Sequence, residues 1–195
     1  MLIADYSYGC LRKVTWPGLV TSTFAGISPE ATPDEQPSSR DRRGTEARFA
    51  AIAAMTMGPD GILYVAEGGS YSEADAGAGF RIRKVAPDGN VTTLAGGTRG
   101  FADGKGASAL FGDLAGIAVD RHGHVFVSDS ENDAIREIAP DGIVRTLTGS
   151  TQEIRFPADG KGHAARIRFP GTMAFNDEGD LFVLQDYDGT LRKME

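Results

Sequence analysis

The sequence predicts an all-β fold in which four-stranded antiparallel meanders repeat along the chain. The first observation is a recurring motif, in which an apolar run, a glycine turn and a second apolar run ending in a polar residue follow one another. The turn glycines Gly61, Gly123 and Gly179 lie 62 and 56 residues apart. The second observation is that short apolar runs alternate with turn signals throughout, whereas helical periodicity is weak. Units of this length bury their faces by stacking on their neighbours, so the repeat determines the architecture.

One unit illustrates how the strands are predicted. Apolar runs at 116–119 and 125–127 flank the turn at Gly123, and two further runs follow after a polar loop. The last two runs are separated by a Pro-Asp-Gly turn at 140–142. In such a turn proline presets one torsion angle and glycine accepts a positive φ. Four short runs joined by tight turns therefore predict an antiparallel meander.

Composition and charge exclude several classes of function. The chain has 195 residues and a net charge of −7, which disfavours binding to nucleic acid or to an anionic membrane surface. Its one cysteine, Cys10, excludes a disulfide within the chain. We expect no signal peptide and no transmembrane segment, because no stretch is long and apolar enough. The compartment stays open: the protein is cytoplasmic, or it is exported as part of a longer chain.

The units resemble NHL repeats, the blade motif of a family of β-propellers. Residues 116–120, 126–129 and 135–136, together with Asn132, match the family form closely. The segment 101–111, which recurs at 156–169, also resembles the linker between blades in bacterial and plant members. The resemblance implies an all-β fold of β-propeller blades, each a four-stranded antiparallel meander. It is specific for the fold and nearly silent on function.

The repeat predicts about three and a half blades in a single domain. A partial blade spans 2–26, complete blades span 45–96 and 97–149, and a blade lacking its last strand spans 150–195, with an inserted loop at 27–44. The family typically closes with six blades, so we expect an incomplete ring or an open arc. The chain is then a segment of a longer propeller, or an arc that associates with a second copy or with the missing blades. Four blades closing alone is a third, minor alternative.

Meander geometry predicts which face binds a ligand. The short glycine turns lie on one face, whereas the loops between second and third strands and the linkers lie on the other. The longest of these segments are 27–44 and 68–79, the second of which contains Tyr71. Function usually resides on long irregular loops carried by a regular scaffold, so we predict the binding face on this side. The alternative is that 27–44 is an insertion with no role.

Acidic residues recur at the end of the second strand of each unit, on this predicted binding face. They could hold a cation such as calcium, because hard cations take oxygen ligands. They could instead cap loops and pair with the recurring arginines, and repetition in every blade favours this structural role. The arginines are Arg12, Arg83, Arg136 and Arg192. The candidate ligand-binding residues are Asp5, Glu67, Tyr71, Asp129, Asn132 and Asp186. We predict no catalytic set and no metal site, since His122 and His124 fall on the face of the short turns and His163 on the other.

These observations favour a non-catalytic scaffold that binds a protein, peptide or glycan partner through its loop-rich face, without a cofactor and without nucleic-acid or membrane partners. The alternative is a segment of a six-bladed enzyme. The family resemblance implies that such an enzyme would be a lactonase or lyase that holds a divalent cation with Asp, Glu, Asn or His. An enzyme needs unlike polar residues that converge at one place, and the polar residues here repeat instead.

Overall fold

The computed structural model of the chain describes residues 1–5, 9–27, 39–68, 79–149, 157–186 and 188–194. These residues form antiparallel strands, short 3₁₀ turns and loops, with no α-helix among them. The all-β prediction is therefore confirmed. No described helix has the length and apolar character needed to cross a membrane.

The strands assemble into four sheets, which we call blades 1 to 4. Blade 1 contains β1 (Leu2–Asp5), β2 (Cys10–Thr15) and β3 (Val20–Gly26). Blade 2 contains β4 (Ala51–Met57), β5 (Leu63–Gly68), β6 (Arg81–Val85) and β7 (Val91–Gly96). Blade 4 contains β13 (Pro170–Phe175), β14 (Leu181–Gln185) and β15 (Thr190–Met194).

Blade 3 has five strands because a linker adds one to its outer edge. Its meander is β9 (Leu114–Val119), β10 (Val125–Asp129), β11 (Ala134–Ile138) and β12 (Ile143–Thr148). The two-residue strand β8 (Gly104–Lys105) pairs with β12, so that β12 lies between β11 and β8. The sequence analysis predicted only the four strands of the meander.

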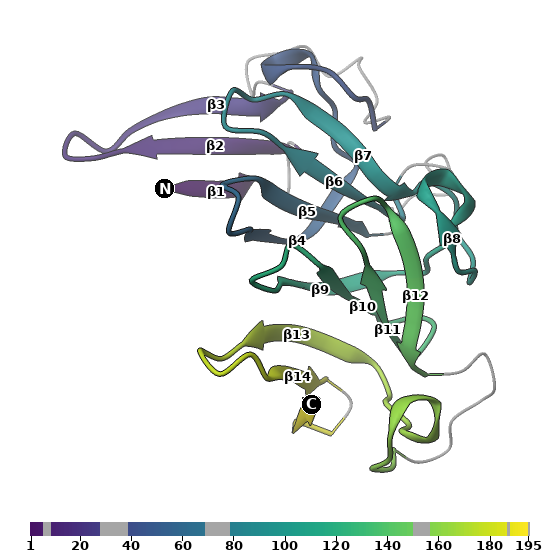
Figure 1. Cartoon of the computed structure of the whole chain (residues 1–195). Helices are drawn as coiled ribbons and strands as arrows, with labels where there is room; N and C mark the ends of the chain where they lie inside the picture. Colours follow the sequence, from purple (N-terminus) through teal and green to yellow (C-terminus); the bar gives the residue numbers. More distant parts are fainter. Residues whose placement is uncertain (6–8, 28–38, 69–78, 150–156, 187, 195) are drawn as a thin grey trace.

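The four blades follow one another in chain order as an arc (Figure 1). Their first strands β4, β9 and β13 lie side by side. The linkers that enter blades 2, 3 and 4 each contain a 3₁₀ turn, at Gly44–Glu46, Gly106–Ser108 and Gly162–Ala164. Such a linker carries the chain from the outer strand of one blade to the first strand of the next.

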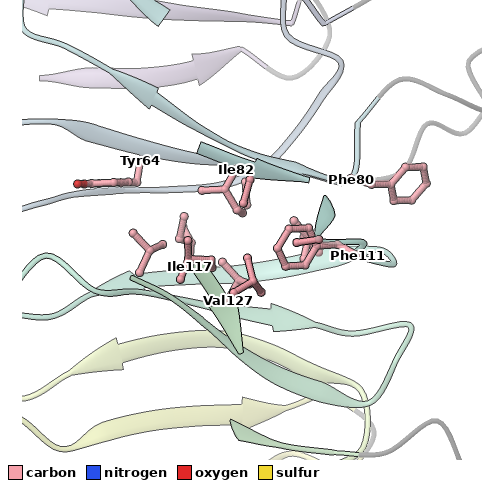
Figure 2. Close-up of a cluster of buried hydrophobic side chains, with 13 residues drawn as sticks. Tyr64, Phe80, Ile82, Phe111, Ile117 and Val127 are labelled. Atoms are coloured by element: carbon pink, nitrogen blue, oxygen red, sulfur yellow. The ribbon is translucent and has the colours of Figure 1, made fainter. Parts of the chain in front are cut away.

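The hydrophobic core lies between blades. Figure 2 shows one cluster, in which Tyr64 and Ile82 of blade 2 face Ile117 and Val127 of blade 3. Phe111, from the linker before β9, fills the end of the same cluster. Two further clusters include residues of blades 1 and 2 and of blades 3 and 4. Each blade therefore buries its faces only by packing on a neighbour.

The Pro-Asp-Gly turns form as the sequence predicts. Gly89 and Gly142 both have φ near 84°. Their N–H groups donate to the carbonyls of Ala86 and Ala139 at 2.8 Å, which closes the hairpins β6–β7 and β11–β12. The positive φ is the conformation that glycine adopts at least cost.

The linker repeat also precedes blade 2, where the sequence analysis did not recognise it. Residues 41–44, which we assigned to the inserted loop 27–44, take the place that 103–106 take in blade 3. Arg42 and Arg43 stand where the second linker has Gly104 and Lys105, which hides the likeness. Residues 28–38 and 69–78, which hold most of the two predicted binding loops, lie outside the described residues.

Candidate functional site

A buried arginine organises the outer half of blade 3. Arg136, on β11, is fully buried, and its Nη1 donates to Asp129 Oδ2 at 2.9 Å. Its Nη2 donates to Asp103 Oδ1 of the linker, also at 2.9 Å. The carbonyls of Leu110 and Ala102 accept from the same guanidinium at 3.1 and 2.8 Å. The arginine thus joins the end of β10 to the linker that precedes the blade.

Asp103 extends this network to the outer strand. Its carboxylate accepts from the Thr146 N–H at 3.1 Å and from the Thr146 hydroxyl at 2.8 Å. Since Thr146 lies on β12, one carboxylate joins the linker to both β11 and β12. We call the arrangement of arginine, linker aspartate and outer-strand threonine the Arg-Asp-Thr network.

Blade 2 contains the same network. The guanidinium of Arg83 is ion-paired with the buried Glu67 and donates to Asp41 Oδ1 at 2.7 Å. Asp41 accepts from both the N–H and the hydroxyl of Thr93 at 2.9 Å. The two networks share their geometry although the residues that supply them differ, with glutamate replacing aspartate at the end of the second strand.

Burial and hydrogen bonding shift the pKa values of Asp129 and Asp103 in opposite directions. Desolvation raises the pKa of Asp129 to about 6, even though Arg136, Asn132 and the Gly112 N–H all favour its charged form. Desolvation also acts to raise the pKa of Asp103, but the hydrogen bonds from Thr146 and Arg136 outweigh it and lower that pKa. The difference follows from burial, since Asp103 remains half exposed.

In blade 4 the network is only partly built. Arg192, on β15, contacts Asp159 of the linker at 2.6 Å and donates to the Ala158 carbonyl at 3.0 Å. The side chain of Asp159 is 97% exposed, compared with 51% for Asp103 and 46% for Asp41. Among the described residues, no threonine contacts this carboxylate as Thr93 and Thr146 contact theirs.

Among the described residues, a cavity lies beside β15, on the side where β7 and β12 lie in blades 2 and 3. Its volume is about 550 Å³. One side is β15, the outer strand of its sheet, and the other is the linker segment Gly160–Gly162. Apolar side chains of Leu147, Ile167 and Met194 line it, together with Asp159 and Arg192. We call this cavity the β15 slot.

The acidic residues predicted from the sequence do not form an arc of accessible carboxylates. Glu67 and Asp129 are fully buried beside their arginines. Asn132 belongs to the same structural network, because its Nδ2 donates to Asp129 Oδ1 at 2.8 Å and to the Gly100 carbonyl at 3.0 Å. Asp5 ends β1, where it pairs in register with Cys10, and Tyr71 lies outside the described residues.

The fourth predicted carboxylate, Asp186, is displaced by one residue. It is exposed and follows β14, whereas Gln185 occupies the buried position and accepts from the Arg168 N–H at 3.2 Å. Counting seven residues back from the arginine would have found this position, since Asp129 lies seven before Arg136. In the described part of the chain, no three His, Cys, Asp or Glu side chains gather where they could hold a metal ion.

Comparison with known proteins supports the propeller fold. No protein-family model matches the chain, and no curated protein matches it significantly in sequence. Solved structures do match over its whole length. An auxiliary nutrient binding protein from Bacteroides thetaiotaomicron has a TM-score of 0.68 at 14% identity, and one from Bacteroides ovatus has 0.64 at 14%. An inactive variant of virginiamycin B lyase from Staphylococcus aureus, with quinupristin, has 0.54 at 13%.

All three comparisons cover 100% of this chain but only 44%, 44% and 51% of the matched chains. The chain therefore spans about half the length of these structures. Identities this low show the fold alone. Together with the arc of antiparallel sheets, they confirm the prediction of β-propeller blades in an incomplete ring.

Proposed function

We propose that this chain is a non-catalytic propeller module of the NHL-repeat type that binds a protein or peptide partner. The observation that carries the proposal is the β15 slot. In blades 2 and 3 the linker aspartate accepts hydrogen bonds from both the arginine and the threonine of the outer strand. In blade 4 the aspartate is exposed beside a cavity, so its hydrogen-bonding capacity is available to a partner.

The chemistry of the slot favours a peptide over a glycan. A strand at the edge of a sheet offers rows of backbone donors and acceptors to an added strand. The slot also combines apolar side chains with one exposed carboxylate, which suits alternating side chains of an extended peptide. The names of the two Bacteroides neighbours indicate that ligand binding occurs on this fold, which is consistent with a binding role here.

A selection experiment tests the proposal. The full chain is immobilised and presented with a displayed library of random nine-residue peptides, and recovered peptides are measured individually against the chain and against Asp159→Lys. We expect recovered peptides to bind saturably and to lose most of their affinity for the variant. Recovery of no peptide, or equal binding to the variant, contradicts a peptide-binding function at this slot.

The likeness to virginiamycin B lyase supports a second candidate, a segment of a cation-dependent enzyme. A native-state cation site would raise the melting temperature, because a ligand that binds only the folded state stabilises it. We expect millimolar Ca²⁺, Mg²⁺, Mn²⁺ and Zn²⁺ to leave the melting temperature unchanged. A saturable increase with one of these ions, absent with the others, would favour the enzyme over the binding module.

A further inference from the structure

We propose that a groove between blades 3 and 4, on the face of the short turns, binds a primary ammonium group carried on an apolar body. The groove lies between the turn 120–123 of the hairpin β9–β10 and the turn 176–179 of the hairpin β13–β14, and its volume is about 360 Å³. We call it the turn groove. The side chains that carry the proposal all lie on these two hairpins and on β11, so the proposal is independent of the peptide-binding function.

The floor of the turn groove is aromatic. Phe126 of β10 and Phe175 of β13 both line it, and their ring centroids are 5.2 Å apart with the rings at 76° to each other. This edge-to-face arrangement is a favourable one for two aromatic rings. Phe126 remains half-buried, so part of its surface is open to the groove. A cavity of this volume with an apolar floor is typical of small-ligand sites.

The rim of the turn groove is acidic. Three of the four charged side chains that line it are carboxylates, those of Asp120, Asp177 and Glu178. Asp120 Oδ1 accepts from two N–H groups of its own turn, both at 2.8 Å. Asp177 and Glu178 are exposed, and within the described part of the chain neither has a hydrogen-bond or ion-pair partner. The fourth side chain, Arg121, donates from Nε to His122 at 3.2 Å. The rim therefore favours a cation.

Blade 3 breaks the repeat at a position beside this groove. The residue directly after the recurring arginine is a lysine in the other three blades and Glu137 in blade 3. Glu137 pairs in register with Phe126, so the two side chains are neighbours on one face of the sheet. Glu137 Oε1 lies 2.7 Å from Nδ1 of His124. Blade 3 thus places a carboxylate where the other blades place an ammonium group.

Blade 2 shows what the lysine does at this position. Tyr64 takes the place of Phe126 and pairs in register with Lys84. The Lys84 ammonium lies 5.8 Å from the centroid of the Tyr64 ring, within the range of a cation–π interaction. The Tyr64 hydroxyl donates to Asp60 Oδ2 at 3.2 Å. In blade 2 the chain itself therefore supplies an ammonium group to an aromatic ring beside an acidic turn, whereas blade 3 has the ring and the acidic turn without the ammonium group.

A second difference keeps Phe126 from burying itself as Tyr64 does. The Tyr64 ring lies over Gly58, where an added Cβ would come within 2.7 Å of the ring. Asp120 takes the place of Gly58 in blade 3, since the N–H of each donates to the carbonyl four residues on. The Asp120 side chain excludes the ring from that position. Phe126 packs on Phe175 instead, and it stays half-buried whereas Tyr64 is 3% exposed.

The chemistry of the ligand follows from these contacts. An ammonium group on the Phe126 ring would be near the carboxylates of the rim, and the apolar body would cover the aromatic floor. A primary ammonium has three N–H donors for those carboxylates. A free amine and the lysine side chain of a polypeptide both offer this chemistry.

A titration of the full chain with phenethylamine, followed by ¹H–¹⁵N NMR, tests the proposal. A ligand of about nine non-hydrogen atoms should bind saturably with a dissociation constant on the order of 1 mM. The shifted amides should lie in the turns 120–123 and 176–179. Phenethyl alcohol, which has the same shape without the charge, should bind about tenfold more weakly. Equal affinity for the alcohol, or shifts confined to other parts of the chain, would overturn the proposal.

Variants at the broken position give the sharpest result. Glu137→Lys restores the lysine of the other blades, and should weaken phenethylamine binding at least about tenfold because the protein then supplies the ammonium group itself. Glu137→Gln removes only the charge and should weaken binding about threefold. Glu46→Lys makes the same charge change on an exposed linker turn and should leave the affinity unchanged. The melting temperatures of the three variants show that they fold. An unchanged affinity of Glu137→Lys would contradict the proposal.

A second ligand distinguishes the two sources of the ammonium group. Nα-acetyl-lysine amide presents a lysine side chain without a free α-amino group. If it binds at the turn groove as tightly as phenethylamine, the groove accepts lysine side chains of polypeptides. If only phenethylamine binds, the ligand is a free amine. If neither compound binds saturably, the turn groove is not an ammonium site, and the peptide selection at the β15 slot is unaffected by that result.

Discussion

Blades 3 and 4 carry the same arginine and the same linker aspartate, yet their surroundings differ. In blade 3 the outer strand β12 covers the network and joins Asp103 through Thr146. In blade 4 the equivalent Asp159 is exposed beside the β15 slot. The comparison teaches that a repeated motif has no fixed role of its own. The same residues are structural where a strand covers them and accessible where none of the described strands does.

The largest expected difference between the two blades lies in their arginines. Replacing Arg136 by methionine leaves the buried carboxylate of Asp129 without its cation, and should lower the free energy of unfolding by about 3–5 kcal/mol. Replacing Arg192, whose ion-pair partner is exposed, should cost at most about 1 kcal/mol. Urea denaturation of both variants measures the difference. Equal losses of unfolding free energy in the two variants would contradict the claim that the buried ion pair of Arg136 contributes more to stability than the exposed ion pair of Arg192.

Asp129 should make the stability of blade 3 depend on pH. Blade 4 lacks this dependence, because the uncharged Gln185 occupies the equivalent buried position. The pKa of Asp129, about 6 in the folded chain, lies above the ordinary value of 3.8. The folded state therefore binds this proton more tightly than the unfolded state does. The resulting contribution of Asp129 to the free energy of unfolding is full below pH 3.8 and is lost as pH rises through 6. Between pH 4 and 7 the loss should amount to about 2–3 kcal/mol.

Unfolding titrations of the parent chain and of Asp129→Asn between pH 4 and 7 check this expectation. The variant should lose this part of the pH dependence, whatever its absolute stability. The control is Asp103→Asn, because the pKa of Asp103 is lowered and its contribution is lost only as pH falls below the ordinary range of aspartate. Identical slopes for the parent chain and Asp129→Asn would contradict the assignment.

The smallest expected difference concerns the two linker aspartates. Asp103→Asn weakens hydrogen bonds to Arg136 and Thr146 and should cost about 1–2 kcal/mol. Asp159→Asn removes a nearly fully exposed carboxylate and should change stability by less than about 0.5 kcal/mol. Thermal or urea unfolding of the pair distinguishes them. A larger effect at Asp159 would mean that its carboxylate makes interactions beyond its ion pair with Arg192.

Much of the fold could be predicted from local sequence, because each blade is built from short-range hairpins. The Gly61, Gly123 and Gly179 turns and the Pro-Asp-Gly turns place the strands within a few residues of where the structure has them. The linker before blade 2 was missed because Arg42 and Arg43 mask its likeness to the glycine-rich copies. This linker is recognised by the hydrogen bond that Asp41 accepts from Arg83. The two residues are far apart in the sequence, so local patterns do not reveal the contact.

The candidate site was harder to predict, for a physical reason. Repetition in the sequence indicated a structural role for Glu67 and Asp129, and the structure buries both beside arginines. The β15 slot differs from its counterpart in blade 3 in the surroundings of the linker aspartate, not in the motif. Asp103 bonds to Thr146 of β12, whereas Asp159 is exposed beside β15. The Asp-Gly-Lys-Gly segments of blades 3 and 4 are identical at 103–106 and 159–162, so sequence alone assigns them the same role.

Hydrogen exchange of the backbone amides in β11 and β15 tests the central claim most directly. In the free chain, β11 lies between β10 and β12, and should exchange slowly, whereas β15, at the edge of its sheet, should exchange faster. Adding a peptide of residues 142–149 should slow exchange in β15 and leave β11 unchanged. Equal protection of both strands in the free chain, or no protection of β15 by the peptide, would contradict the claim that the outer edge of β15 is accessible to a peptide in the chain of residues 1–195.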